Sequence, residues 1–177
     1  MNKTKIIITG LAEIDKNILA NEIIKNDDSL TIAPIFTTDK EDETKQYMDV
    51  KTVNLSYKNN ALFYIYTNNY ISIGVTIEDY NDSDIFVTNI NEFNNISDRF
   101  FKTDDIIVVL ADSKNLDNVI LTKYKYELKY LNDRLSNVHF IYFTDDLNVT
   151  AKNAANTILK YVHGDENIRY EILKENS

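Results

Sequence analysis

The feature that most constrains the fold is an alternation of short apolar runs with longer helical patterns. Residues 5–9 centre on three isoleucines, as expected of a central strand in a parallel sheet buried on both faces. Residues 14–26 then repeat Ile and Leu at helical spacing. The same alternation predicts further strands at residues 31–36, 84–90, 106–110 and 138–143. It predicts further helices at residues 115–135 and 149–162. We therefore expect an α/β fold, with a mostly parallel sheet of about five strands flanked by helices.

A segment of different character interrupts this pattern. Three short runs rich in β-branched and aromatic residues are separated by Asn-rich turns, at residues 50–55, 61–66 and 70–75. They predict a small antiparallel β insert. Because no repeat or low-complexity linker is present, we expect a single domain, with a core at residues 1–49 and 82–165 and the insert at 50–75.

Composition narrows the class of protein. A chain of 177 residues that is 44% hydrophobic suits one folded domain. The absence of Cys excludes disulfides, thiolate catalysis and cysteine zinc sites. No run approaches the roughly 20 apolar residues of a membrane span, and the start of the chain does not have the form of a signal peptide. We expect a cytoplasmic protein that does not bind membranes.

Charge and codon-related biases add two expectations. The net charge of −9 argues against non-specific binding to nucleic acid, and it leaves open an acidic surface that imitates DNA, although the carboxylates are dispersed. Only three Gly and one Pro, beside abundant Asn, Ile, Lys and Tyr, are typical of an AT-rich coding sequence. This bias suggests a virus, a phage or a low-GC microbe, and the host cytoplasm as the location in the viral or phage case.

A candidate phosphate-binding loop follows the first strand. Gly10 and Lys16 match the pattern G-x-x-x-x-G-K-[ST], whereas Asp15 replaces the second Gly and Asn17 replaces the hydroxyl residue. A carboxylate about 4 Å from a phosphate charge costs on the order of 4 kcal/mol at an effective dielectric constant near 20. Two interpretations stay open. Asp15 caps the following helix, or Gly10, Lys16 and Asn17 form a modified phosphate site.

Several short motifs occur in a recognisable order. They are FTTD at residues 36–39, NYIS at 69–72, IFVTNIN at 85–91 and TDDL at 144–147. Together with the degenerate phosphate loop, this succession over residues 4–162 resembles the guanylate kinase family of P-loop nucleoside monophosphate kinases. In that family a Thr-Thr-Arg loop, a Tyr-Gly-Thr segment, an I-L-D-I-D strand and an Asn-Asp-Asp-Leu segment occupy these places. The resemblance implies a P-loop kinase-like fold.

The same resemblance implies a set of site residues, several of which depart from the family pattern. The monophosphate-binding candidates are Thr38, Tyr47, Tyr70, Asn89 and Asn91, and the lid candidates are Lys123, Lys125 and Lys129. Asp39 stands where the family has Arg, within an acidic loop that should repel a phosphate. The two asparagines replace an acidic pair, and the purine-reading Glu corresponds to an apolar position near Ile65. No residue is a confident catalytic candidate, although Lys16 would be one in an active kinase.

These departures favour a catalytically inactive guanylate kinase-like protein that binds another macromolecule, namely a protein. Phosphoryl transfer depends on positioned charge, so the joint loss of cationic and metal-binding groups removes the chemistry. We then expect no cofactor and no metal, and we expect the cleft between insert and sheet to be the binding site. The alternative is a nucleoside or deoxynucleoside monophosphate kinase of altered specificity that uses ATP and Mg²⁺. A nucleotide sensor without turnover lies between the two, and the oligomeric state stays open.

Other side chains that carry chemistry have ordinary structural interpretations. His139 and His163 lack metal-ligand or triad partners in the sequence and are expected to serve packing and capping. The aromatic run at residues 63–66 is expected to form the face of a small sheet, with base stacking as the functional alternative. A stripe of Tyr and Lys at residues 123–130 is either a solvated helix face or a partner-binding surface.

Overall fold

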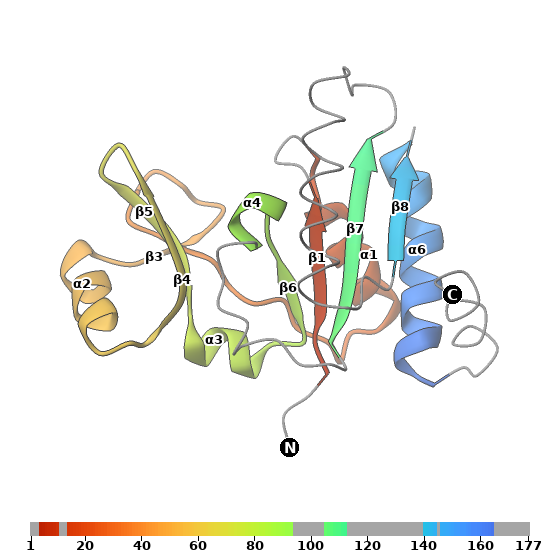
Figure 1. Cartoon of the computed structure of the whole chain (residues 1–177), viewed down its shortest axis with the longest axis horizontal. Helices are drawn as coiled ribbons and strands as arrows, with labels where there is room; N and C mark the ends of the chain where they lie inside the picture. Colours follow the sequence, from red (N-terminus) through yellow and green to blue (C-terminus); the bar gives the residue numbers. More distant parts are fainter. Residues whose placement is uncertain (1–3, 11–13, 94–104, 113–139, 145, 165–177) are drawn as a thin grey trace.

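The computed structural model describes residues 4–10, 14–93, 105–112, 140–144 and 146–164, and it contains two sheets side by side (Figure 1). The first is a four-stranded parallel sheet in the order β6-β1-β7-β8. Its strands are β1 (Ile6–Gly10), β6 (Ile85–Val87), β7 (Ile106–Asp112) and β8 (Phe140–Thr144). The predicted parallel α/β core is confirmed. Beyond β6, the predicted fifth strand contributes a single bridge, from Ile32 to Ile85.

Two helices cover one face of the parallel sheet. They are α1 (Asn17–Asn26) and α6 (Leu147–Val162), and they lie on the same side of the strands in Figure 1. Ile6 and Ile8 of β1 pack into the hydrophobic core shared with these helices, whereas Ile7 packs into the core of the opposite face. Both faces of the sheet are therefore buried, which explains why the strand is a continuous apolar run.

The opposite face joins the parallel sheet to the second sheet through aromatic side chains. Phe63 stacks on Tyr80 with ring centroids 3.9 Å apart and planes inclined by 9°. The ring of Phe86 meets the ring of Phe63 edge-on at 5.2 Å and that of Tyr80 edge-on at 5.6 Å. These three residues come from the second sheet, from α3 (Ile77–Asp82) and from β6, so one aromatic cluster ties all three elements together.

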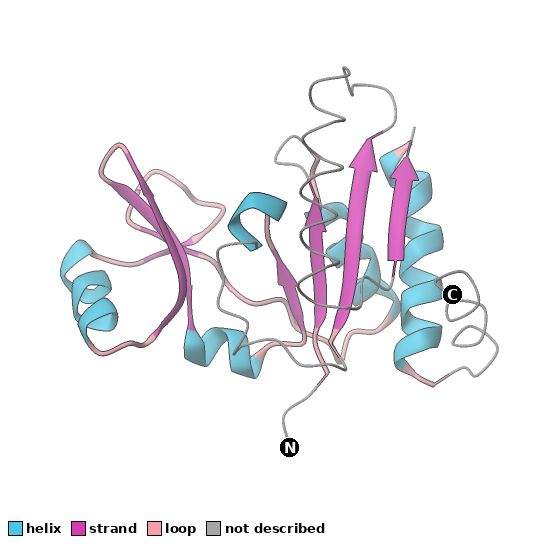
Figure 2. Cartoon of the chain, in the orientation of Figure 1, coloured by secondary structure: helices cyan, strands magenta, loops and turns pink. Residues whose placement is uncertain are grey.

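The second sheet has the order β3-β2-β5-β4 and is mixed. It comprises β2 (Phe36–Thr37), β3 (Gln46–Tyr47), β4 (Leu62–Asn68) and β5 (Ile71–Thr76), and Figure 2 shows it set apart from the parallel strands. β5 is antiparallel to both β2 and β4. Asn69 and Tyr70 join β4 to β5 with φ angles of 47° and 69°, as in a type I′ hairpin turn.

The predicted strand at residues 31–36 is divided between the two sheets. Ala33 N–H donates to the carbonyl of Ile85 at 2.8 Å, on the edge of the parallel sheet, and Phe36 already pairs with Gly74 in the second sheet. Pro34 lies between them and has no N–H to continue the first ladder. The proline therefore marks the point where the chain leaves one sheet for the other.

The predicted strand at residues 50–55 is wrong, because this segment begins helix α2 (Val50–Lys58). Asp49 caps the helix, with its carboxylate accepting from Lys51 N–H at 3.0 Å and Thr52 N–H at 3.1 Å. Alternating apolar residues in the sequence favoured a strand, but only Val53 of this helix is buried. The two other predicted strands of the insert are confirmed as β4 and β5.

Within the described ranges, no helix is long and apolar enough to cross a membrane. The long helix predicted at residues 115–135 and His139 lie outside the described residues.

A buried lysine holds the amino-terminal edge of the parallel sheet. Lys5, which is 4% exposed, donates from Nζ to the carbonyl of Asn81 at 2.9 Å and also to the carbonyl of Ser83. Its Nζ lies 4.9 Å from the centroid of the Tyr80 ring, and its backbone N–H donates to the buried carboxylate of Asp105 at 3.0 Å. Lys5 therefore binds the end of α3 to the beginnings of β1 and β7.

We predict that Lys5→Met destabilises the protein by about 2–4 kcal/mol, because it leaves buried carbonyl groups without a donor. Urea unfolding followed by circular dichroism measures this loss. The matched control is Lys25→Met, which removes an exposed ion pair with Glu22 and should change the free energy of unfolding by less than about 0.5 kcal/mol. Equal effects of the two substitutions would contradict the role given to Lys5.

Candidate functional site

A cavity of about 380 Å³ lies at the carboxyl ends of β1 and β6, the edge where open parallel sheets bind ligands. Its walls come from the start of α1, the crossing between the sheets, the end of β6 and helix α4 (Ile90–Phe93). The lining residues are Ile14, Asp15, Lys16, Asn17, Ile35, Val87, Thr88, Asn89 and Glu92. Three predicted site residues, Lys16, Asn17 and Asn89, are thus brought together.

Gly10 ends β1 and does not line this cavity. It pairs with Leu110 of β7, and a Cβ atom at position 10 would lie 2.4 Å from the carbonyl oxygen of Leu110. Residues 11–13, which connect Gly10 to the cavity wall, lie outside the described residues. Packing between β1 and β7 is therefore sufficient to require glycine at this position.

Asp15 and Lys16 are both engaged within their own loop. The carboxylate of Asp15 accepts from Asn17 N–H, the first amide of α1, at 3.1 Å. It does so from one position before the N-cap, which is Lys16, so Asp15 is not itself the N-cap residue that the sequence predicted. Lys16 is 5% exposed, and its Nζ donates to the carbonyl of Ile14 at 2.9 Å. A phosphate placed in the cavity would compete with that carbonyl for the ammonium group.

Glu92 was not predicted as a site residue. Its Oε2 accepts from Asn89 N–H at 3.2 Å and from the hydroxyl of Thr88 at 3.3 Å. Asn89 precedes the first residue of α4 and Glu92 is the third residue, so this bond is one half of a capping box. The signal that could have found it is the polar residue followed by Glu three positions later. Burial and the nearby Glu92 carboxylate also raise the pKa of the Tyr64 hydroxyl.

Of the predicted monophosphate-binding residues, Asn89 lines the cavity, whereas Thr38, Tyr47 and Tyr70 do not. Thr38 links β2 to β5, because its N–H donates to the carbonyl of Ser72 at 2.9 Å and its hydroxyl accepts from Ser72 N–H at 2.8 Å. Tyr47 is half-exposed in β3, with the ammonium of Lys40 lying 5.4 Å from its ring centroid. Tyr70 is 98% exposed at the hairpin tip, and Asn91 lies in α4.

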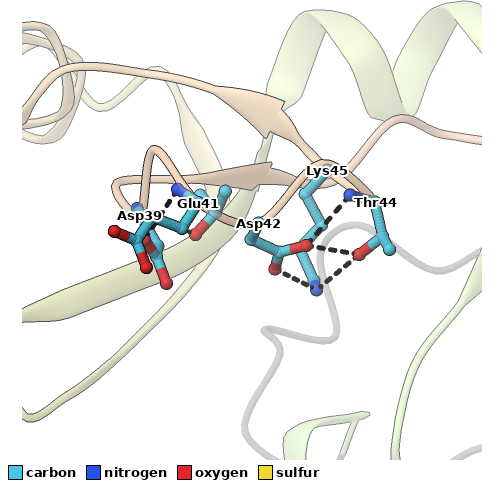
Figure 3. A network of polar contacts seen from close by, with 6 residues as sticks. Asp39, Glu41, Asp42, Thr44 and Lys45 are labelled. Atoms are coloured by element: carbon cyan, nitrogen blue, oxygen red, sulfur yellow. Dashed lines mark hydrogen bonds and ion pairs between the residues drawn. The ribbon is translucent and has the colours of Figure 1, made fainter.

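The acidic loop after β2 satisfies its own carboxylates (Figure 3). The carboxylate of Asp39 accepts from Glu41 N–H at 2.9 Å, and that of Asp42 accepts from Thr44 N–H at 3.0 Å. Lys45 Nζ lies 2.6 Å from the Asp42 carboxylate, and this bond, aided by the bonds from Thr44, lowers the pKa of Asp42 to about 2. The loop therefore presents carboxylates where the resemblance implies a cationic phosphate clamp.

The remaining candidates lie elsewhere. Lys123, Lys125 and Lys129 are outside the described residues. Within the part of the chain that the structure describes, no cluster of three or more His, Cys, Asp or Glu side chains could hold a metal ion. His163 follows the last residue of α6, and its Nε2 lies 3.2 Å from the carboxylate of Asp27 at the end of α1.

Comparison with known proteins gives a structural likeness. No protein-family model and no curated protein matches the sequence. Among solved structures, the crystal structure of guanylate kinase from Anaplasma phagocytophilum is similar, with a TM-score of 0.54 and 13% sequence identity. The match covers 89% of this chain and 85% of that one. At this identity the likeness concerns the fold alone, so the chain has a guanylate kinase-like fold.

Proposed function

We propose that this chain is a guanylate kinase-like protein without kinase turnover, and that it binds a protein partner through the cavity beside β1 and β6. The main support for the proposal is the hydrogen bond that the ammonium group of Lys16 already makes inside its own loop. Its ammonium donates to the carbonyl of Ile14, while the carboxylates of Asp15 and Glu92 line the same cavity. The charged groups on the wall are two anions and one engaged cation.

This arrangement opposes a nucleotide phosphate. A carboxylate about 4 Å from a phosphate charge costs on the order of 4 kcal/mol at an effective dielectric constant near 20. Two carboxylates line the cavity, and Lys16 offsets only one of them. Catalysis of phosphoryl transfer consists mainly of positioning and of stabilising negative charge, and Asn17 offers no hydroxyl for Mg²⁺. We therefore propose no ATP and no Mg²⁺ at this site.

The same charges favour a cationic group. A Lys or Arg side chain of a protein partner would form charge-assisted hydrogen bonds with the carboxylates of Asp15 and Glu92. Asn89 adds an amide on the same wall, and Ile35 and Val87 provide apolar surface for the aliphatic part of such a side chain. The net charge of −9 also steers a basic partner toward the molecule.

The alternative function is a nucleoside or deoxynucleoside monophosphate kinase of altered specificity. The guanylate kinase-like fold and the place of Lys16 beside the carboxyl end of β1 favour it. In this alternative Lys16 would leave the carbonyl of Ile14 and bind the phosphates of ATP. A nucleotide sensor without turnover would need the same movement but no lid.

We predict that Mg-ATP, GMP and the deoxynucleoside monophosphates do not bind with micromolar dissociation constants, so that titration gives no heat of binding at these concentrations. We also predict that turnover is at least about a thousandfold below an ordinary kinase rate of ~10 s⁻¹. Isothermal titration calorimetry and an ADP-release assay with each monophosphate measure these quantities. Micromolar binding together with turnover near the ordinary rate would establish the kinase alternative.

We predict that Asp15→Gly combined with Asn17→Ser restores measurable binding of Mg-ATP, because Lys16 and the helix terminus remain when the carboxylate is gone. Losing the bond between Asp15 and the first amide of α1 should also lower the free energy of unfolding by about 0.5–2 kcal/mol, and less if Gly is well tolerated there. Titration of both proteins at one salt concentration tests this. A wild type that already binds Mg-ATP as well as the variant does would refute the blocked-site argument.

We predict that neutralising the two carboxylates of the cavity weakens partner binding without unfolding the protein. Glu92→Gln keeps an acceptor for the capping bond to Asn89 N–H, and Asp15→Asn keeps a side-chain acceptor at the start of α1, so both changes remove charge and retain structure. A partner isolated with the wild type should bind the double variant at least about tenfold more weakly. The control is Glu22→Gln on α1, whose side chain does not line the cavity and pairs with Lys25. An unchanged affinity of the cavity variant would place the interface elsewhere.

A further inference from the structure

Strand β4 is one of the two edge strands of the second sheet, and β3 is the other. The strand order β3-β2-β5-β4 places β4 outermost on one side, and β4 is seven residues long. Tyr66, Thr67 and Asn68 are exposed, and none of the described strands pairs with the outer side of β4. Its sequence, LFYIYTN, contains none of the Lys, Asp or Pro residues that protect edge strands from pairing with another chain.

Large hydrophobic side chains are exposed on β4 and on the segments next to it. In the described chain they are Val50, Leu55 and Tyr57 of α2, Tyr66 of β4, Tyr70 of the hairpin turn and Ile71 of β5. A hollow of about 370 Å³ lies between the end of α2 and β4, lined by Tyr57, Lys58, Asn60, Leu62, Tyr64 and Ile65. Exposed tyrosines beside a shallow hollow are typical of protein interfaces.

The distribution of charge favours one kind of partner at the edge of β4, namely a second copy of this chain. The whole chain carries a net charge of −9, so two copies repel each other across most of their surfaces. No charged residue lies between Lys58 and Glu78, and α2 contributes only Lys51 and Lys58. Residues 59–77, which include the edge of β4, therefore contribute no charged side chain, so two copies that meet there bring together no carboxylates from this segment.

We infer that a second copy of this chain pairs with β4, edge to edge and antiparallel, so that the two four-stranded sheets become continuous across a two-fold axis near Ile65. Backbone hydrogen bonds along β4 hold the two copies together, and the exposed aromatic residues of one copy cover the hollow of the other. This inference does not depend on the proposed function, because the cavity beside β1 and the outer side of β4 are different surfaces.

Sedimentation equilibrium from about 10 μM to about 1 mM tests the inference. The wild type should form a dimer in this range. Tyr66→Lys places two like charges across the axis and should weaken dimerisation about tenfold or more. Val149→Lys is the matched control, because Val149 on α6 is 56% exposed, close to the 49% of Tyr66, and the charge change is identical. The control should dimerise like the wild type.

Cross-linking gives an independent measurement, since the chain has no Cys. Under oxidation, Ile65→Cys should give a disulfide-linked dimer, because residue 65 faces its own copy across the axis, whereas Val149→Cys should give no disulfide-linked species. Thr67→Lys replaces Tyr66→Lys if the latter does not fold by circular dichroism. A wild type that is monomeric up to about 1 mM would overturn the inference. This holds also if the monomer binds an added strand peptide at β4, because the occupant would then not be a second copy. A dimer that is insensitive to both lysine variants and is not trapped through β4 would overturn it as well.

Discussion

The arrangement of the two sheets depends on one buried ammonium group. Lys5 has almost no contact with solvent, so its Nζ must find acceptors within the protein, and it finds the carbonyls of Asn81 and Ser83 at the end of α3. The carboxyl end of a helix carries partial negative charge, which suits a cation. Since α3 is the segment by which the chain returns from the second sheet, this bond fixes where the return occurs.

The aromatic cluster also holds the two sheets together, next to Lys5. Phe63, Tyr80 and Phe86 pack between the sheets directly beside the buried lysine, whose Nζ lies over the ring of Tyr80. Burial, together with the carboxylate of Asp105, raises the pKa of the Tyr80 hydroxyl. The tyrosine hydroxyl therefore stays protonated even at mildly alkaline pH.

Carboxylates in this protein serve repeatedly as acceptors for backbone amides. Asp15 bonds the first amide of α1, Asp49 caps α2, and Glu92 bonds the amide of Asn89, which precedes α4. Each of these bonds satisfies an amide that the helix itself leaves unpaired. Two of these carboxylates, those of Asp15 and Glu92, also line the cavity. The groups that bond the starts of α1 and α4 therefore give the cavity wall its negative charge. The proposed loss of phosphate chemistry thus follows from groups that stabilise the fold.

Much of the parallel core could be predicted because its signal is local. The isoleucines of β1 and the periodic apolar residues of α1 and α6 each point to one element, and the structure places them as expected. The helix α2 could not be predicted from the alternation of apolar and polar residues, which favours a strand. The carboxylate of Asp49 caps the segment as a helix instead. Thr38, Tyr47 and Tyr70 were chosen from motif order. Motif order does not specify the direction of a side chain, and these three are used for pairing or face solvent.

The path of the chain between the sheets has an evolutionary consequence. The second sheet is entered just after Ala33 and left just before Asp84, and these points are adjacent, because Ala33 N–H bonds to Ile85 and Asp84 N–H bonds to the carbonyl of Thr31 at 3.0 Å. The intervening segment is thus a module grafted onto neighbouring points of one scaffold edge. The exposed part of such a module can change its sequence, lose its charges or acquire new partners under separate selection, as long as Phe63 and Tyr80, which pack against the scaffold, are kept.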